Sequence, residues 1–404
     1  MERLQGLLGI AVIFGVLILF SRHRKNIRWR TLGVGLLLQI AFALIVLKWD
    51  YGFLALKKIA QGLEKLTEFT NEGTSFVFGG LFGEKSGFVF ALNVLPVIIF
   101  LGAIIGALYY LRVIQIFVDV LGGALKKILG TSKVESVWAS TVIFLGQSEA
   151  PLVINPYLPK LTRSELFTCM TGGFASVAGS TLIGYSLLGA PLEYLLAASL
   201  MNAPGSLIVA KAFWPETEES NLDASVRDVR DTESKNIIDA IGSGAMAGGK
   251  IAIAVGCLLI AFIAFIAMIS AILGGIGSWF GQDHWSLEGL FGVLFAPVAW
   301  LIGVPWSDAQ MVGNFIGEKT IINEFVGFTS FGPHIPDMDP KSVMITTFAL
   351  AGFANISSMA IQIGSIGGLV PERRGEVAKL APLALMTGFA TNMLNAAIVG
   401  VVVF

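Results

Sequence analysis

The sequence has few charged residues, few histidines and almost no cysteine. Only 14% of its 404 residues are charged, whereas soluble domains carry about 25%. Its 27 Lys and Arg against 28 Asp and Glu leave no basic excess for a nucleic-acid surface. The two cysteines, Cys169 and Cys257, lie in apolar stretches and match neither a disulfide framework nor a zinc motif. The remainder is rich in hydrophobic residues, 55% of the chain, which indicates an integral membrane protein.

Eight stretches are apolar and close to the length of about 20 residues that a helix needs to cross a bilayer. The predicted spans are 5–21, 31–48, 89–112, 165–188, 191–213, 249–274, 342–369 and 380–403. The first is expected to be retained, because it lacks the basic flank and cleavage site of a signal peptide. The basic loop 21–30, "SRHRKNIRWR", is expected to face the cytoplasm. This orientation predicts a multi-pass protein of the inner (cytoplasmic) membrane with both termini outside.

Two connections between the spans have a character of their own. The apolar positions of residues 51–70 follow helical spacing: Leu56, Ile59, Leu63 and Leu66. Because charged residues occupy the other faces, a helix lying at the membrane interface is favoured over a soluble amphipathic helix. It completes an N-terminal unit, residues 1–88. The polar segment 214–248 is predicted to be a cytoplasmic linker with some helix.

Two further segments, 130–158 and 303–331, have apolar halves too short to span a membrane and polar groups near the middle. Each contains an early acidic residue, a glycine before the polar centre and a glutamate after it. Their surroundings match as well, which predicts an inverted repeat of 89–213 against 249–404, each copy with one re-entrant hairpin. The predicted fold class is therefore an all-α polytopic membrane protein with an interfacial helix. Paired interrupted segments of this kind place a binding site near the midplane.

Glu149 and Glu324 occupy matching positions in the two hairpins, and an ionisable group within the membrane indicates function. The alternative is a structural carboxylate that caps a helix N-terminus. Asn355 and Ser358 lie on one helical face of an otherwise apolar span, although serines in membrane helices often serve only the backbone. Lys319 is the one nearby cation, and it is expected on the hairpin stem. Carboxylates and amides without cations suit a neutral, hydroxyl-rich solute joined to a planar ring.

The motifs "GQSEAPL" (146–152), "INEFVGF" (322–328) and "GFANISSMAIQIGSIGGLVPERR" (352–374) resemble those of the concentrative nucleoside transporters. The resemblance implies a homotrimer in which a hairpin-bearing transport domain moves against a fixed scaffold. It implies an ion-coupled symporter that imports nucleosides of the uridine and adenosine class by alternating access. The implied nucleobase-binding residues are Gln147, Ser148, Glu149, Thr181 and Phe353, and the implied ribose-binding residues are Glu324, Asn355 and Ser358.

The resemblance also implies a sodium site formed by the carbonyls of Leu145 and Val177, the hydroxyl of Ser176 and an asparagine side chain. Val142 stands where the family has that asparagine, and valine offers no oxygen ligand. H⁺ is therefore favoured as the coupling ion, with Na⁺ as the alternative and Thr141 as a substitute ligand. No organic cofactor is expected.

Two other function classes are alternatives to import. An intramembrane hydrolase would use Glu149 and Glu324 as an acid–base pair, but the sequence has no nucleophile elbow, HExxH motif or cofactor loop. A passive channel is less consistent with inverted repeats, which are typical of alternating access. The sequence therefore predicts a transporter and not an enzyme.

Overall fold

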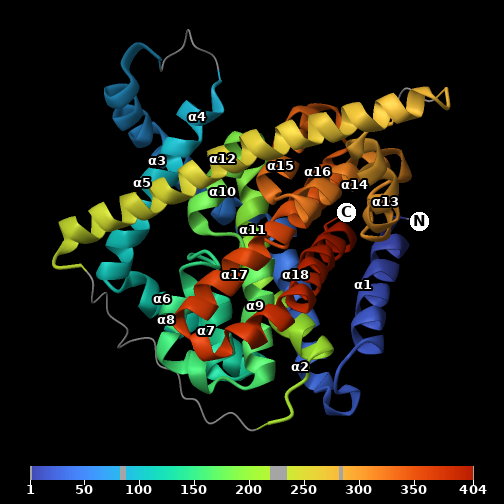
Figure 1. Ribbon diagram of the computed structural model, residues 1–404. Coiled ribbons are helices and arrows are strands. Elements are labelled where there is room, and N and C mark those ends of the chain that lie inside the picture. Colours follow the sequence, from blue (N-terminus) through green and yellow to red (C-terminus); the bar gives the residue numbers. More distant parts are fainter. Residues whose placement is uncertain (1, 82–87, 219–233, 282–284, 404) are drawn as a thin grey trace.

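The computed structural model describes residues 2–81, 88–218, 234–281 and 285–403, and within these ranges it contains helices and loops but no strand (Figure 1). The N-terminal helices are α1 (Glu2–Leu19), α2 (Trp29–Ala43), α3 (Asp50–Phe78), α4 (Phe90–Asn93), α5 (Leu95–Tyr110) and α6 (Val113–Leu129). A π-helical turn, Leu44–Lys48, extends α2. The central helices are α7 (Lys133–Thr141), α8 (Ala150–Val153), α9 (Arg163–Ala175), α10 (Gly179–Leu187) and α11 (Leu192–Phe213). The C-terminal helices are α12 (Ile237–Ser278), α13 (Leu287–Leu301), α14 (Trp306–Ile321), α15 (Glu324–Phe331), α16 (Pro340–Leu350), α17 (Ile356–Leu369) and α18 (Arg374–Val402).

Six helical segments of the described residues are long and apolar enough to cross a membrane, or seven if the bent pair α13–α14 is counted as one span. The six are Trp29–Lys48, Phe90–Tyr110, Arg163–Leu187, Leu192–Phe213, Ile237–Ser278 and Pro371–Val402. They correspond to six of the predicted spans. The first predicted span is a shorter apolar helix, Leu4–Leu19. The span predicted over 342–369 is divided between α16 and α17. The count of eight therefore stays a prediction.

Helix α12 is the longest element, with 42 residues, and runs obliquely across the molecule (Figure 1). It begins at Ile237, so the last part of the predicted linker, 237–248, is helical; residues 219–233 of that linker lie outside the described residues. Glycines bring α12 against α5, since a Cβ at Gly106 would come within 2.5 Å of the Ala240 carbonyl oxygen. Small residues permit such close approach between membrane helices.

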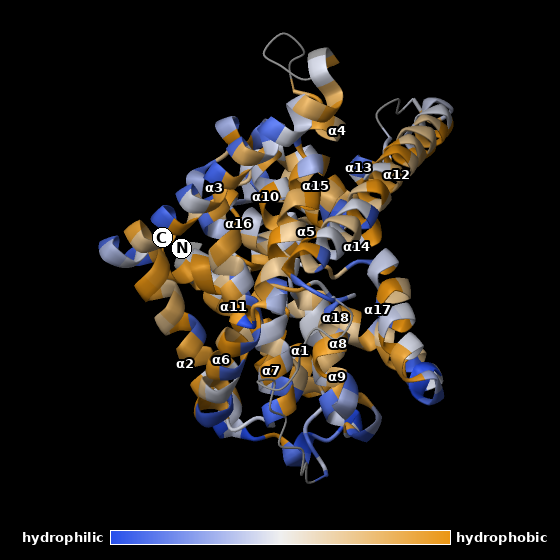
Figure 2. Cartoon of the chain, turned by 90° about the vertical axis from the view of Figure 1, so that its left-hand side faces the viewer, coloured by the Kyte–Doolittle hydropathy of each residue, from blue (hydrophilic) through white to orange (hydrophobic). Residues whose placement is uncertain are grey.

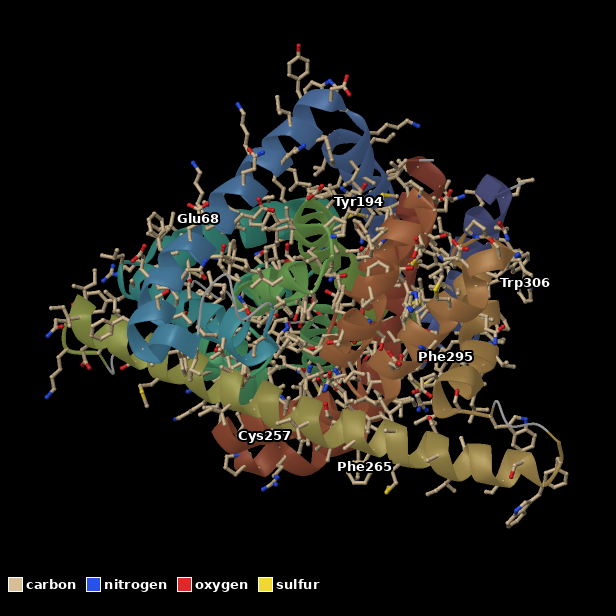
Figure 3. The ribbon with its side chains drawn as sticks, turned by 90° about the horizontal axis from the view of Figure 1, so that it is seen from above. Glu68, Tyr194, Cys257, Phe265, Phe295 and Trp306 are labelled. Atoms are coloured by element: carbon tan, nitrogen blue, oxygen red, sulfur yellow. The ribbon has the colours of Figure 1, made fainter. Side chains whose placement is uncertain are left out.

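Helix α3 is longer than the interfacial helix predicted over 51–70. Its buried face contains Leu56 and Ala60, whereas Ile59 is 58% exposed. The apolar face is therefore rotated away from Ile59. Charged residues such as Glu68 lie on the exposed side (Figure 3). Hydrophilic residues also gather at the opposite end of the molecule, around the loops that precede α7 and α9 (Figure 2).

Both predicted hairpins contain a turn between helices. Residues 142–149 connect α7 to α8, and Ile322 and Asn323 connect α14 to α15. The α7 N-terminus has a capping box between Ser132 and Glu135, and the Asn323 side chain accepts from the Val326 N–H at 3.0 Å. These caps satisfy amide groups that a helix cannot pair internally. Helix α14 is bent by 117° from α13. Re-entrant insertion and the inverted repeat stay predictions.

Two of the predicted spans are broken near their middles, and the breaks touch. Residues 176–178 separate α9 from α10, residues 351–355 separate α16 from α17, and the Phe353 N–H donates to the Ser176 carbonyl at 3.0 Å. The side chain of Asn392 on α18 donates to the carbonyls of Ala175 at 2.9 Å and Ala351 at 3.1 Å. Backbone groups freed by the breaks thus find partners within the protein, as the hydrocarbon core requires.

Candidate functional site

A cavity of about 170 Å³ lies where the two hairpin turns meet α10, α12 and α17. It is lined by every residue that the resemblance implicates in substrate binding, drawn from both halves of the chain: Gln147, Ser148, Glu149, Thr181, Glu324, Phe353, Asn355 and Ser358. Among the residues that the structure describes, no lysine, arginine or histidine joins them in the lining. The cavity therefore offers two carboxylates, amides and hydroxyls without a side-chain cation.

Glu324 is the most firmly held group in the cavity. Glu324 is only 5% exposed. Its Oε1 accepts a hydrogen bond from the Tyr185 hydroxyl at 3.0 Å, and its Oε2 accepts one from Asn355 Nδ2 at 2.8 Å. A carboxylate has about four lone-pair positions, so these two side-chain bonds leave acceptor capacity for a ligand. Tyr185 packs against Phe325 and Phe328, with ring centroids 4.7 and 4.6 Å away. The sequence did not identify Tyr185, although it lies one helical turn after Thr181.

Asn355 caps the N-terminus of α17, and its Oδ1 accepts from the Ser358 N–H at 2.8 Å and from the Ser357 hydroxyl at 2.7 Å. With the bond from its Nδ2 to Glu324, three hydrogen bonds fix the orientation of the Asn355 amide. This local role as a helix cap explains why the predicted span is broken here: the side chain replaces the hydrogen bonds that a continuous helix would supply.

Gln147, from the first hairpin turn, reaches α17. Its Nε2 donates to the Ser358 hydroxyl at 2.8 Å, and its Oε1 accepts from Gln362 Nε2 at 3.1 Å. Gln362 also donates to the Met170 carbonyl at 3.0 Å. Gln362 is a second residue that the sequence did not identify; its position four residues after Ser358 puts it on the same helical face. The amide of Gln147 is thereby fixed at the edge of the cavity.

The remaining lining residues are less constrained. Glu149 Oε2 accepts from the Gly146 N–H at 3.3 Å, Thr181 Oγ1 donates to the Ala178 carbonyl at 2.9 Å, and Ser148 is exposed. Helix α12 closes one side with an apolar wall that the sequence did not predict: Ile251, Ala254, Val255 and Leu258. The cavity thus combines polar groups on one side with hydrocarbon on the other, a usual composition for small-molecule sites.

The implied cation ligands Leu145, Ser176 and Val177 are buried beside the cavity but do not line it. The Ser176 hydroxyl donates to the Gly173 carbonyl at 2.9 Å, and the Thr141 hydroxyl donates to the Val137 carbonyl at 2.8 Å. Each hydroxyl oxygen keeps lone pairs for a cation. Val142 is 2% exposed and contributes only hydrocarbon.

Lys319 lies on the hairpin stem, as expected, and does not face the cavity. It is fully buried, and its Nζ donates to the Ala349 carbonyl at 2.8 Å and to Asn392 Oδ1 at 2.7 Å. Asn392 contacts both helix breaks, so Lys319 supports the backbone around the cavity from behind. Nothing in the sequence spacing indicated that the long side chain would point inward.

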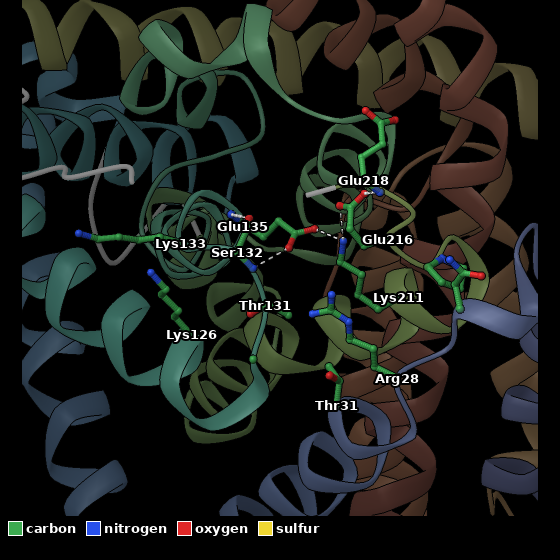
Figure 4. Close-up of a pocket in the computed structure, with 13 residues that line it drawn as sticks. Arg28, Thr31, Lys126, Thr131, Ser132, Lys133, Glu135, Lys211, Glu216 and Glu218 are labelled. Atoms are coloured by element: carbon green, nitrogen blue, oxygen red, sulfur yellow. Dashed lines mark hydrogen bonds and ion pairs between the residues drawn. The ribbon is translucent and has the colours of Figure 1, made fainter. Parts of the chain in front are cut away.

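A larger cavity of about 340 Å³ lies at the other end of the first hairpin, around the N-terminus of α7 (Figure 4). Its central charges pair with one another: Lys211 Nζ contacts Glu135 Oε1 at 2.5 Å and Glu216 Oε2 at 3.4 Å. None of the implied substrate residues lines it. It is therefore distinct from the candidate site.

Comparison with known proteins assigns a family to nearly the whole chain. A model described as "Na+ dependent nucleoside transporter C-terminus" matches residues 194–400, and its N-terminal counterpart matches residues 8–81. A model described as "Gate: Nucleoside recognition" matches residues 91–192. Each half of the candidate cavity falls within a matched region.

The similarity to individual relatives extends over nearly the full length of this chain and of each relative described below. The chain is 48% identical over 401 residues to the uncharacterized transporter YutK of Bacillus subtilis, covering 99% of both proteins. It is 41% identical over 410 residues to the nucleoside permease NupC of Helicobacter pylori, covering 98% of this chain and 97% of NupC. The structure of CNTnw in an inward-facing substrate-bound state is 45% identical with a TM-score of 0.95, covering 100% of this chain and 98% of CNTnw.

A CNTnw variant in an outward-facing state superposes equally well, with a TM-score of 0.94, 44% identity, and coverage of 100% of this chain and 98% of the variant. Structures of one fold open to opposite sides support alternating-access transport of nucleosides. Because the relatives are transporters and permeases of the cell membrane, the chain is a multi-pass transporter and not an enzyme. The chain belongs to the concentrative nucleoside transporter family.

Proposed function

We propose that this protein is an ion-coupled symporter that imports nucleosides, binding them in the cavity between the two hairpin turns. The observation that carries the proposal is Glu324, a buried carboxylate held by Tyr185 and Asn355 with acceptor positions left over. Two vicinal ribose hydroxyls are the donors that such a carboxylate can accept from together. Charge-assisted hydrogen bonds of this type are among the stronger contacts available in a dry site.

The other lining residues fit the rest of a nucleoside. Asn355 and Ser358 lie beside Glu324 and supply further polar contacts for the ribose. The first hairpin turn offers the amide of Gln147, the hydroxyl of Ser148 and the carboxylate of Glu149 to the edge of the base. Thr181 adds a second hydroxyl. Phe353 and the α12 wall supply apolar surface for the flat ring. Purines and pyrimidines both meet this description, so uridine and adenosine are the test substrates.

We further propose that transport follows an elevator motion, in which the hairpin-bearing part moves against α12. The cavity is bounded on one side by α12 alone, and sliding along that smooth apolar wall would expose the ligand first to one side and then to the other. Helix α12 also exposes large apolar side chains that do not line the cavity, among them Ile253, Ile260 and Phe265; Figure 3 shows Phe265 on the outer side of the helix. This face and the family resemblance support a homotrimer, which native mass spectrometry in mild detergent tests directly.

The coupling ion that the family description supports is Na⁺, the alternative in the sequence analysis, and not the H⁺ that Val142 favours. We propose a sodium site in which main-chain carbonyls of Leu145 and Val177 and the hydroxyls of Ser176 and Thr141 supply the oxygens. A hard cation requires oxygen ligands. The valine at position 142 removes one side-chain ligand, but the two carbonyls and two hydroxyls remain.

Uptake of radiolabelled uridine and adenosine into proteoliposomes, with the Na⁺ and H⁺ gradients set independently, tests both the nucleoside import and the coupling to Na⁺. We expect accumulation against a gradient when Na⁺ is higher outside at equal pH, with no effect of a protonophore. Accumulation that follows the pH gradient and collapses with a protonophore would assign H⁺ instead. Equilibration without accumulation under every gradient would indicate a passive channel.

A further inference from the structure

A third cavity, which shares no lining residue with the nucleoside site, opens between α1, α13 and α18. It has a volume of about 560 Å³; α1 and α13 lie at one edge of the molecule, and α18 packs on the inner side of α1 (Figure 1). Its lining is apolar except for Thr387 and Arg22. The Thr387 hydroxyl donates to carbonyls of its own helix at 3.0 and 3.1 Å. Arg22 is thus the one charged group in the lining among the described residues.

The groove opens on an exposed apolar surface. Val16 and Phe20 of α1 are 49% and 63% exposed, and Met386 of α18 is 62% exposed. An apolar cavity does not hold water, and an empty groove would forfeit the dispersion contacts of its walls. Because these helices belong to the membrane part of the protein, the material available to fill the groove is hydrocarbon.

At its end of the groove, Arg22 shares the indole ring of Trp214 with Arg163, although neither Trp214 nor Arg163 lines the groove itself. Arg22 Cζ lies 5.7 Å and Arg163 Cζ lies 5.1 Å from the Trp214 ring centroid. Arg163 also contacts Glu376, with Nε 3.7 Å from Oε1, whereas Arg22 has no carboxylate partner within the described part of the chain. Guanidinium groups bind phosphate through paired N–H donors, and basic pockets between membrane helices bind anionic lipid headgroups.

We propose that the groove is a binding site for an anionic glycerophospholipid, with one acyl chain between α1 and α18 and the phosphate at Arg22. The lipid completes the packing of α1, whose apolar segment is shorter than a full span, against the C-terminal helix. The proposal does not depend on the nucleoside site, because no groove residue lines it.

The test uses the delipidated full-length protein, titrated with phosphatidylglycerol or phosphatidylcholine and followed by native mass spectrometry. Arg22→Gln removes the headgroup contact, and Ala390→Phe fills the groove. Arg24→Gln is the matched control, since it removes a charge from the same basic loop but does not line the groove. We expect Arg22→Gln to lower phosphatidylglycerol affinity about fivefold, the equivalent of about 1 kcal/mol, with phosphatidylcholine unchanged. Ala390→Phe should weaken the binding of both lipids, and Arg24→Gln should change neither by more than about twofold.

Three results would overturn the proposal. Equal affinity of the wild-type protein for the two lipids would show that the groove does not select an anionic headgroup. Equal losses in Arg22→Gln and Arg24→Gln would leave only a general attraction of the basic loop for anionic lipid. Unchanged lipid binding by a folded Ala390→Phe variant would show that the chain does not occupy the groove.

Discussion

Glu324→Gln is the substitution that examines the proposed ribose site most directly. Glutamine keeps the shape but turns one acceptor oxygen into a donor. Its amide NH₂ can face Tyr185, whose hydroxyl is able to accept, while its oxygen keeps the bond from Asn355. The internal contacts therefore survive, and the loss falls on the acceptor positions that face the ligand.

The size of the loss follows from the number of bonds affected. Each hydrogen bond from a ribose hydroxyl to the carboxylate contributes about 1.5–3 kcal/mol. Losing the charge and one acceptor should cost about 2–4 kcal/mol, or roughly 30- to 1000-fold in nucleoside affinity. Isothermal titration calorimetry of the purified protein with uridine measures the loss of affinity, and native mass spectrometry checks that the oligomer stays intact.

A ligand without the hydroxyls separates the ribose contact from general damage. A 2′,3′-dideoxynucleoside should bind the wild-type protein weakly and lose much less from Glu324→Gln than uridine does. Glu149→Gln makes the same chemical change in the other hairpin turn, so its loss should be similar for the two ligands. If uridine and its dideoxy analogue lost equal affinity in Glu324→Gln, the carboxylate would serve structure or ion coupling, and the site assignment would be wrong.

Three further substitutions address the groups around the cavity. Tyr185→Phe leaves Glu324 Oε1 without its donor and should weaken uridine binding by about 1–2 kcal/mol, or roughly 5- to 30-fold; unchanged affinity in calorimetry would exclude a positioning role. Lys319→Met leaves the buried acceptors of Ala349 and Asn392 unpaired, so it should lower the free energy of unfolding in denaturant by about 2–5 kcal/mol. An unchanged free energy of unfolding would contradict the structural role of Lys319. Thr141→Val removes a proposed ion ligand isosterically and should raise the Na⁺ concentration for half-maximal uptake by at least about threefold, about 0.7 kcal/mol; an unchanged value would remove this hydroxyl from the ion site.

The polar interruptions of the sequence located the cavity, because burying a carboxylate or amide in a membrane is costly and is rarely retained without use. Residues 146–149 lie in the first hairpin turn of the structure, and Asn323 and Glu324 lie where the second turn passes into α15. The same argument could not find Tyr185, since a tyrosine in an apolar run is equally typical of a membrane interface. Nor could it find the α12 wall, because α12 is apolar on every face and periodicity does not mark the side that meets a ligand.

The division of the predicted span 342–369 has a local cause that hydropathy does not report. A hydropathy average over a sliding window reports one continuous apolar run. In the structure α16 ends at Leu350, and α17 begins after Asn355, a strong N-cap residue. In the sequence analysis Asn355 is a polar group on one helical face with Ser358, and that spacing does not by itself indicate a break. A capping residue in the middle of an apolar run is the signal that predicts a broken helix, and Ser358, whose N–H it accepts, completes the pattern.

The breaks and turns also explain how the site holds two carboxylates without any cation in its lining. Glu324 begins α15 and Asn355 caps α17, so two helix N-termini point towards the cavity. Each N-terminus carries the equivalent of roughly half a positive elementary charge. Fixed dipoles can therefore stabilise the Glu324 anion while leaving its lone pairs directed at the ligand, which a lysine or arginine would occupy. A neutral nucleoside gains from this arrangement, whereas the phosphate of a nucleotide would bring its negative charge against Glu149 and Glu324. The same geometry that replaces a cation with helix ends thus selects uncharged, hydroxyl-bearing substrates.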